Sequence, residues 1–160
     1  MAKRFVIGIA ALILGALLTT PMLLGQTDSY SCNEYLLYGD YGFSVEGYKF
    51  AGPVGSPTSP MRGVAMTTFD GSGNLTQLDT VVVNGVKTSD FTEEKATGKY
   101  RVNPDCTGTF TITFPAGDPR PPVTTNFVIT NNGDDIDTVV IAPPGVLLIA
   151  SHGKKRFTRW

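Results

Sequence analysis

The 160-residue sequence is poor in the side chains that most metal centres and hydrolytic active sites need. It has one histidine, His152, and two cysteines, too few for the four ligands of a structural zinc site. It has no Gly-x-Ser-x-Gly motif, and its four glutamates (Glu34, Glu46, Glu93 and Glu94) show no spacing that pairs them for glycoside hydrolysis. From the residues alone we therefore predict no catalytic group, no metal site and no cofactor, with His152 as a surface residue.

Neither sign of charge dominates the sequence. There are 13 basic and 14 acidic residues, for a net charge of −1, which gives no general case for binding nucleic acid. Four of the 13 bases lie at the end of the chain, in the segment Lys154–Trp160 (KKRFTRW). This basic tail has two interpretations: it binds an anionic lipid or glycan, or it is a terminus or edge strand with solubilising charges.

Long helical patterns are absent except at the very start. Lys3 and Arg4 precede a nearly continuous apolar run, Phe5–Leu18, which is typical of a secretory signal peptide. We predict a signal peptide over residues 1–27, a single β-barrel domain over residues 28–160, and an exported protein, periplasmic or extracellular. No stable membrane span is expected after cleavage. The alternative is an uncleaved anchor, because Phe5–Leu24 is about as long as a membrane span.

Two cysteines remain after export, Cys32 and Cys106. An even count in an exported chain favours a disulfide, and the alternative is two unpaired buried thiols. A closed loop of this size stabilises the fold by on the order of 4 kcal/mol in the chain-entropy account. The bond would tie the N-terminal segment to a central hairpin.

That hairpin, Lys99–Phe114, shows the dominant pattern of the chain. Phe110, Ile112 and Phe114 alternate with three threonines, which puts an apolar row on one face of a strand and a hydroxyl row on the other. Asn103-Pro104-Asp105 is typical of a turn, in which the aspartate bonds back to nearby backbone amides, and Gly108 permits a bulge.

The same alternation and turn chemistry recur along the rest of the chain. Asn84-Gly85 is the dipeptide that a type I′ hairpin turn favours, and Gly47 marks a bulge or bend. The predicted strands are 40–50, 62–69, 75–83, 86–92, 96–103, 107–114, 123–130, 136–142 and 146–151, the last of which the tail extends. We predict an all-β fold, an antiparallel meander closed into a small barrel of about eight or nine strands. The alternative is a two-layer β-sandwich.

From about Ser31 to Arg156 the chain resembles a family of small, exported, mostly uncharacterised bacterial proteins. The residues that carry the resemblance are Ser31-Cys32, Tyr41-Gly42-Phe43-Ser44, Gly47, Thr68–Thr76 (TFDGSGNLT), Val83-Asn84-Gly85 and Gly98–Thr109 (GKYRVNPDCTGT). The resemblance implies a calycin-like barrel, similar in outline to that of allene oxide cyclase. It implies no reaction, because no catalytic residue of that enzyme can be placed here.

Three functions fit these observations. The first is a non-enzymatic barrel that holds a small hydrophobic ligand or acts as an envelope interaction module. The inward residues expected to meet such a ligand are Phe43, Phe69, Tyr100, Phe110, Phe114 and Phe127. The second is a cyclase or isomerase acting on a hydrophobic substrate, for which Tyr41, Tyr100 and Glu46 are the candidate inward polar groups. The third is a surface binder that uses the basic tail.

Overall fold

The computed structural model describes residues 31–52, 56, 58–91 and 95–156. The predicted signal peptide and the last four residues of the basic tail lie outside these ranges. In the part of the chain that is described, no helix is long and apolar enough to cross a membrane.

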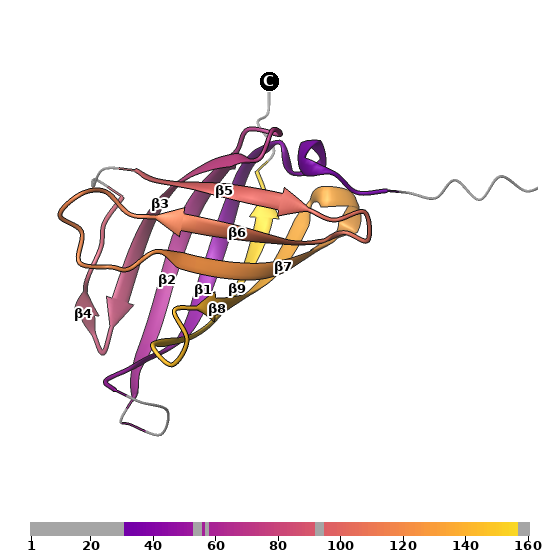
Figure 1. The fold of residues 1–160 in the computed structure, drawn as a ribbon. Coiled ribbons are helices and arrows are strands. Elements are labelled where there is room, and N and C mark those ends of the chain that lie inside the picture. Colours follow the sequence, from indigo (N-terminus) through magenta and orange to yellow (C-terminus); the bar gives the residue numbers. More distant parts are fainter. Residues whose placement is uncertain (1–30, 53–55, 57, 92–94, 157–160) are drawn as a thin grey trace, which may run out of the picture.

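The described residues form nine strands and two short 3-10 helices, all around one sheet (Figure 1). The elements are η1 (Glu34–Leu37), β1 (Gly39–Phe50), β2 (Thr58–Phe69), β3 (Asn74–Val83), β4 (Val86–Lys87), β5 (Ala96–Val102), β6 (Thr107–Thr113), β7 (Val123–Thr130), η2 (Asn131–Gly133), β8 (Asp135–Ala142) and β9 (Leu147–Lys155).

The sheet closes on itself and forms an antiparallel barrel. Its strands follow the order β2-β1-β9-β8-β7-β6-β5-β3, and an additional β2–β3 pairing joins the two ends. Eight strands thus make the wall, and the short β4 pairs only with the end of β3. The predicted all-β meander is confirmed, and closure excludes the two-layer sandwich. The barrel is of the small calycin-like kind that was expected.

The period-two pattern of the sequence determines which residues face inward. Cross-strand partners share a face, and the register pairs Phe43 with Ala65, Ala65 with Asp79, and Tyr100 with Phe110. Alternate residues around the whole wall therefore point into the barrel. β9 runs to Lys155, so the tail extends the last strand as predicted.

Neither Gly47, where a bulge or bend was expected, nor Gly108, which permits a bulge, is the site of a bulge. The ladders run without a register shift through Gly47 and Gly108. The glycines serve close approach instead. A Cβ on Gly47 would lie 2.0 Å from the Leu148 carbonyl oxygen, and one on Gly108 would lie 2.3 Å from the Phe127 ring. In the same way the Phe43 ring lies against Gly153 on the neighbouring strand.

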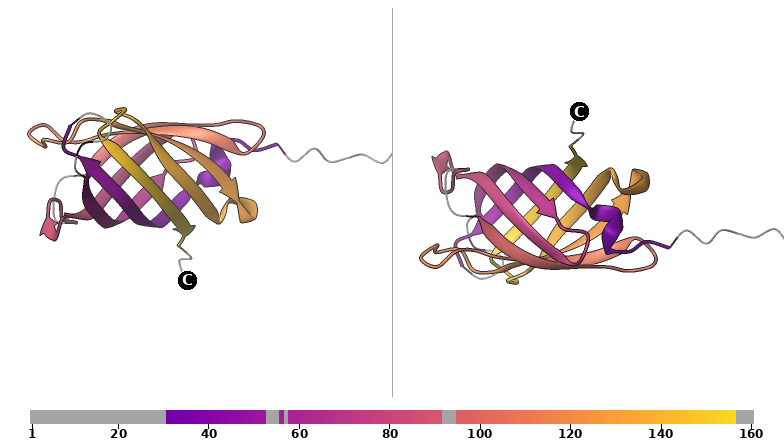
Figure 2. Two further views of the ribbon diagram at one scale, coloured as in Figure 1. Left: turned by 90° about the horizontal axis from the view of Figure 1, so that it is seen from below. Right: turned by 90° about the horizontal axis from the view of Figure 1, so that it is seen from above.

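One end of the barrel is filled by side chains. The short helix η1 lies at this end (Figure 2). Tyr41 and Phe69 meet edge to face at 5.4 Å, and Phe69 meets Tyr100 in the same way at 5.0 Å. Leu37 of η1 and Ile136 of β8 are fully buried beside them. Helix η1 also binds the wall directly, because the Tyr100 hydroxyl donates to the Glu34 carbonyl oxygen at 3.0 Å.

A disulfide between Cys32 and Cys106 ties the residues before η1 to the β5–β6 hairpin. The Cys32 amide also donates to the Pro104 carbonyl oxygen at 3.2 Å. The Asp105 carboxylate accepts from the Thr107 amide at 3.0 Å, as the turn chemistry predicts. The segment before β1 is thereby fastened to the filled end of the barrel.

Candidate ligand-binding cavity

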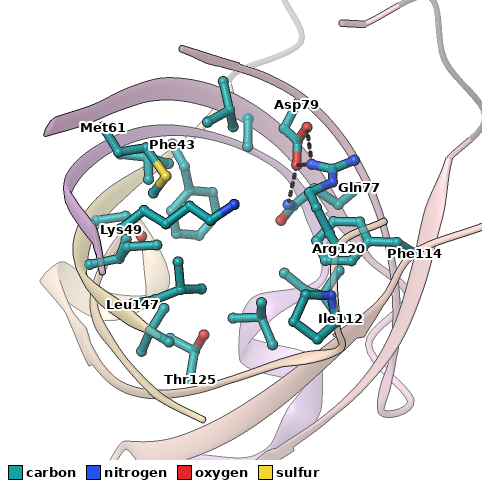
Figure 3. Close-up of a pocket in the computed structure, with 18 of the residues that line it drawn as sticks. Phe43, Lys49, Met61, Gln77, Asp79, Ile112, Phe114, Arg120, Thr125 and Leu147 are labelled. Atoms are coloured by element: carbon teal, nitrogen blue, oxygen red, sulfur yellow. Dashed lines mark hydrogen bonds and ion pairs between the residues drawn. The ribbon is translucent and has the colours of Figure 1, made fainter. Parts of the chain in front are cut away.

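The other half of the barrel encloses a cavity of about 340 Å³ (Figure 3). This is within the usual size range of small-molecule sites, roughly 300–1,000 Å³. Most of the lining is apolar and comes from strands around the wall and the loops beside them: Phe43, Val45, Met61, Ala65, Val81, Val83, Phe110, Ile112, Phe114, Pro119, Pro121, Val123, Val140, Val146, Leu147 and Ile149. The polar lining residues are Lys49, Gln77, Asp79, Thr88, Arg120, Thr125, Thr138 and Ser151.

The six aromatic residues predicted to meet a ligand divide between the two halves. Phe43, Phe110 and Phe114 line the cavity. Phe69, Tyr100 and Phe127 belong to the packed core of the barrel and do not line it. The boundary runs between stacked rings, since Phe110 and Phe127 have centroids 5.8 Å apart.

Arg120 forms the main charged feature of the cavity wall. It lies on the loop between β6 and β7, and its Nη1 donates to both carboxylate oxygens of Asp79 on β3, at 2.8 and 2.9 Å. Its Nε donates to both oxygens of Asp118 at 3.0 Å, and its Nη2 donates to one of them at 2.6 Å. The guanidinium is thus held between two carboxylates, a geometry suited to its planar fork.

This cluster fixes the β6–β7 loop against the barrel. The Arg120 guanidinium also lies over the Phe114 ring, 3.9 Å from its centroid, as a cation–π contact. Hydrogen bonds from the Arg120 side chain hold the pKa of Asp118 below its usual range, against the opposing effect of burial. We name Asp79, Asp118 and Arg120 the arginine latch.

Smaller polar groups in the wall bond to one another. The Gln77 side chain accepts from Thr67 Oγ1 at 2.9 Å and donates to Asp79 Oδ2 at 3.3 Å. Across β8 and β9, the hydroxyls of Thr138 and Ser151 lie 2.6 Å apart. These pairs satisfy polar atoms that would otherwise face an apolar cavity.

Lys49 differs from these groups. It occupies an inward position near the end of β1, and Figure 3 shows its ammonium reaching toward the centre of the cavity. Lys49 is also exposed to solvent, so it marks the mouth. Among the described residues its ammonium has no hydrogen bond or ion pair, whereas Arg120 is bonded to two carboxylates.

The polar groups considered for an enzyme are placed away from the cavity. Tyr41 and Tyr100 point into the filled half, where their hydroxyls donate to the carbonyl oxygens of Gly133 and Glu34. Burial raises the pKa of both tyrosines, which keeps them protonated. Glu46 is not inward as proposed: it lies on the outer face, 3.6 Å from Arg62, because it alternates with the inward Val45. Asp79 does border the cavity, but Arg120 bonds both its oxygens.

His152, Lys154 and Arg156 lie on the outside of the barrel, whereas Lys155 is half-buried at the filled end, where its Nζ donates to the Leu36 carbonyl oxygen at 3.5 Å. His152 Nδ1 is 2.9 Å from Asp137 on the neighbouring strand. Lys154 lies 4.0 Å from Asp135, and Arg156 lies 3.7 Å from Asp40. These bases contact acidic groups of the barrel itself.

The arginine latch and Lys49 were not predicted from the sequence. The inward position of Asp79 could have been: Gln77 and Asp79 share a strand face with Leu75 and Val81, so an inward β3 must carry polar groups into the barrel. Nothing in the sequence pairs Asp79 with Arg120, which lies 41 residues further along the chain.

No family model matches the chain, and no curated protein or solved structure is significantly similar to it. The cavity and its lining are therefore the basis for a function.

Proposed function

We propose that this protein is a non-enzymatic exported barrel that holds a small apolar ligand in its cavity. The observation that carries the proposal is the unequal filling of the interior. One half is packed with aromatic rings, whereas the other encloses about 340 Å³ behind a mainly apolar lining. An eight-stranded barrel is wide enough either to be filled by side chains or to hold one small ligand, and this barrel does each in one half.

The polar groups of the wall support binding more than catalysis. A general base needs a proton-accepting atom within reach of its substrate. The carboxylate oxygens of Asp79 are bonded to Arg120 instead. The tyrosine hydroxyls are bonded to backbone carbonyls at the filled end. Because these polar groups are already hydrogen-bonded, the apolar surface of the cavity is the part that can bind a ligand.

A neutral fluorescent probe tests this function. 1-Naphthylamine is neutral at pH 7, is small enough for a cavity of about 340 Å³, and changes its emission when it leaves water for an apolar site, so we expect a saturable change in fluorescence with the purified protein. Ala65→Phe fills the cavity from β2 and should weaken binding at least tenfold. Ala150→Phe makes the same substitution on the exposed face of β9 and should leave binding unchanged.

Near-ultraviolet circular dichroism checks that each variant is folded. If Ala65→Phe does not fold, Val140→Phe fills the cavity from β8 instead. Absence of saturable binding to the unmodified protein, or equal binding by the inner and outer variants, would refute a cavity ligand.

A further inference from the structure

We infer that the ligand is a single-chain amphiphile with an anionic head group, whose charge is held by Lys49 at the mouth of the cavity. This inference rests on the proposed function. It adds the chemical class of the ligand and the direction in which the ligand lies.

Among the described residues, three ionisable side chains line the cavity: Lys49, Asp79 and Arg120. Arg120 and Asp79 bond to each other, and Asp118 accepts from Nε and Nη2 of Arg120. Among the described lining residues, the Lys49 ammonium is therefore the cation left to meet a ligand, and the latch offers no competing site for an anion.

The position of Lys49 places its charge next to the apolar lining. Lys49 shares the inward face of β1 with Phe43 and Val45, and its cross-strand partner is Leu147, another lining residue. Its apolar stem crosses from the wall toward the middle of the cavity, and the side chain remains exposed to solvent. An apolar chain entering the cavity displaces water from this region, which penalises an unpaired ammonium unless the chain carries an anion. The site therefore favours anionic over neutral and cationic chains.

Lys49 has no protective role that would explain its inward position. Lysines at sheet edges prevent pairing with other chains, but β1 lies between β2 and β9 in a closed barrel and has no free edge. A charge that served solubility alone would be equally effective on the outer face, where Tyr48 stands.

The volume of the cavity limits the length of the ligand's apolar chain. At roughly 30 Å³ for each water-sized atom, a cavity of about 340 Å³ accepts on the order of ten non-hydrogen atoms. The tail is thus a medium-length chain that lies with its end toward the filled half and its head at Lys49. Each added methylene should tighten binding about fourfold until the cavity is full.

Displacement of the neutral probe by four ten-carbon amphiphiles tests the head group, with each kept below its micelle concentration. Decanoate and decyl sulfate should bind at least tenfold more tightly than decanol, and decyltrimethylammonium should bind most weakly. Preference for decanoate over decyl sulfate would narrow the class to carboxylates, and equal affinity would support anions in general. A series of carboxylates from six to fourteen carbons should show the fourfold steps and then a plateau.

Lys49→Met removes the charge and keeps an unbranched apolar stem. It should cost decanoate about tenfold to a hundredfold in affinity and leave decanol unchanged, as expected for loss of a hydrogen bond to a charged group. Lys154→Met makes the same change on the outer wall and should alter neither. Lys49→Glu should reverse the order and favour the cationic amphiphile.

Two results separate the possible failures. Equal affinity for decanoate and decanol, or equal loss of both in Lys49→Met, would overturn the anionic head group while the cavity still binds apolar chains. If neither the neutral probe nor decanol binds the unmodified protein, the proposed function itself fails.

Discussion

Replacing Arg120 alone with methionine should destabilise the barrel more than replacing Arg120 and Asp79 together. Asp79 and Asp118 are largely buried, with side-chain exposures of 10% and 13%, and both depend on the guanidinium. In Arg120→Met the two carboxylates lose their charged donors and stay in place. Asp79 then keeps one contact, from the Gln77 amide at 3.3 Å.

The magnitude follows from the degree of burial. Breaking a fully buried ion pair by removing one partner costs about 3–5 kcal/mol. Because Arg120 is 26% exposed, solvent screens part of this interaction, and we expect Arg120→Met to lower the free energy of unfolding by about 2–3 kcal/mol. Adding Asp79→Leu replaces the stranded carboxylate with an apolar side chain. The double variant should therefore recover at least about 1 kcal/mol relative to Arg120→Met alone.

Urea unfolding of the two single variants and the double variant measures these differences. Arg62→Met is the matched control, because its partner Glu46 and Arg62 itself are about two-thirds exposed. That control should change stability by less than about 0.5 kcal/mol. A double variant as unstable as Arg120→Met, or less stable, would show that the latch is not an interdependent buried network.

Two other features give stability predictions. Replacing Cys32 and Cys106 by serine opens a loop with a sequence separation of 74, which should cost about 4.5 kcal/mol and lower the melting temperature by roughly 15–20 °C in calorimetry; a loss below about 1 kcal/mol would contradict it. The lowered pKa of Asp118 implies stability that is present above its unfolded-state pKa, about 3.9, and is lost as pH falls through the lower folded-state value. Unfolding followed from pH 7 to pH 2 should thus show a steeper acid loss in the unmodified protein than in Asp118→Asn, and identical profiles would refute this.

The strands were predictable because each has its own local pattern of alternating apolar and polar residues. β7 has the predicted bounds, Val123–Thr130, and its inward Phe127 and Ile129 alternate with exposed residues. The Asn84-Gly85 turn joins β3 to β4, as its chemistry requires. The disulfide was predictable from the cysteine count.

The predicted strand over 86–92 is reduced to Val86–Lys87 for a local reason. The buried Ser89 hydroxyl accepts from the Val81 amide at 2.9 Å and so takes the place of a backbone partner in the ladder. A propensity pattern does not contain such a side-chain substitution.

The cavity depends on distances that alternation does not encode. The inward rows of Phe43 and Phe69 look alike in sequence, yet one ring borders empty space and the other is packed among aromatics. The difference arises because η1 inserts Leu37 at one end only. The β6–β7 loop brings Arg120 to Asp79 by folding, and that contact has no local signature.

Because η1 covers the filled end, the interior of the barrel is closed at that end. In the described part of the chain, the cavity meets solvent at the other end of the barrel, beside Lys49. The β6–β7 loop borders the cavity there and is anchored by Arg120. Loosening this anchor would therefore change how quickly an occupant escapes, even where it leaves the walls around that occupant untouched.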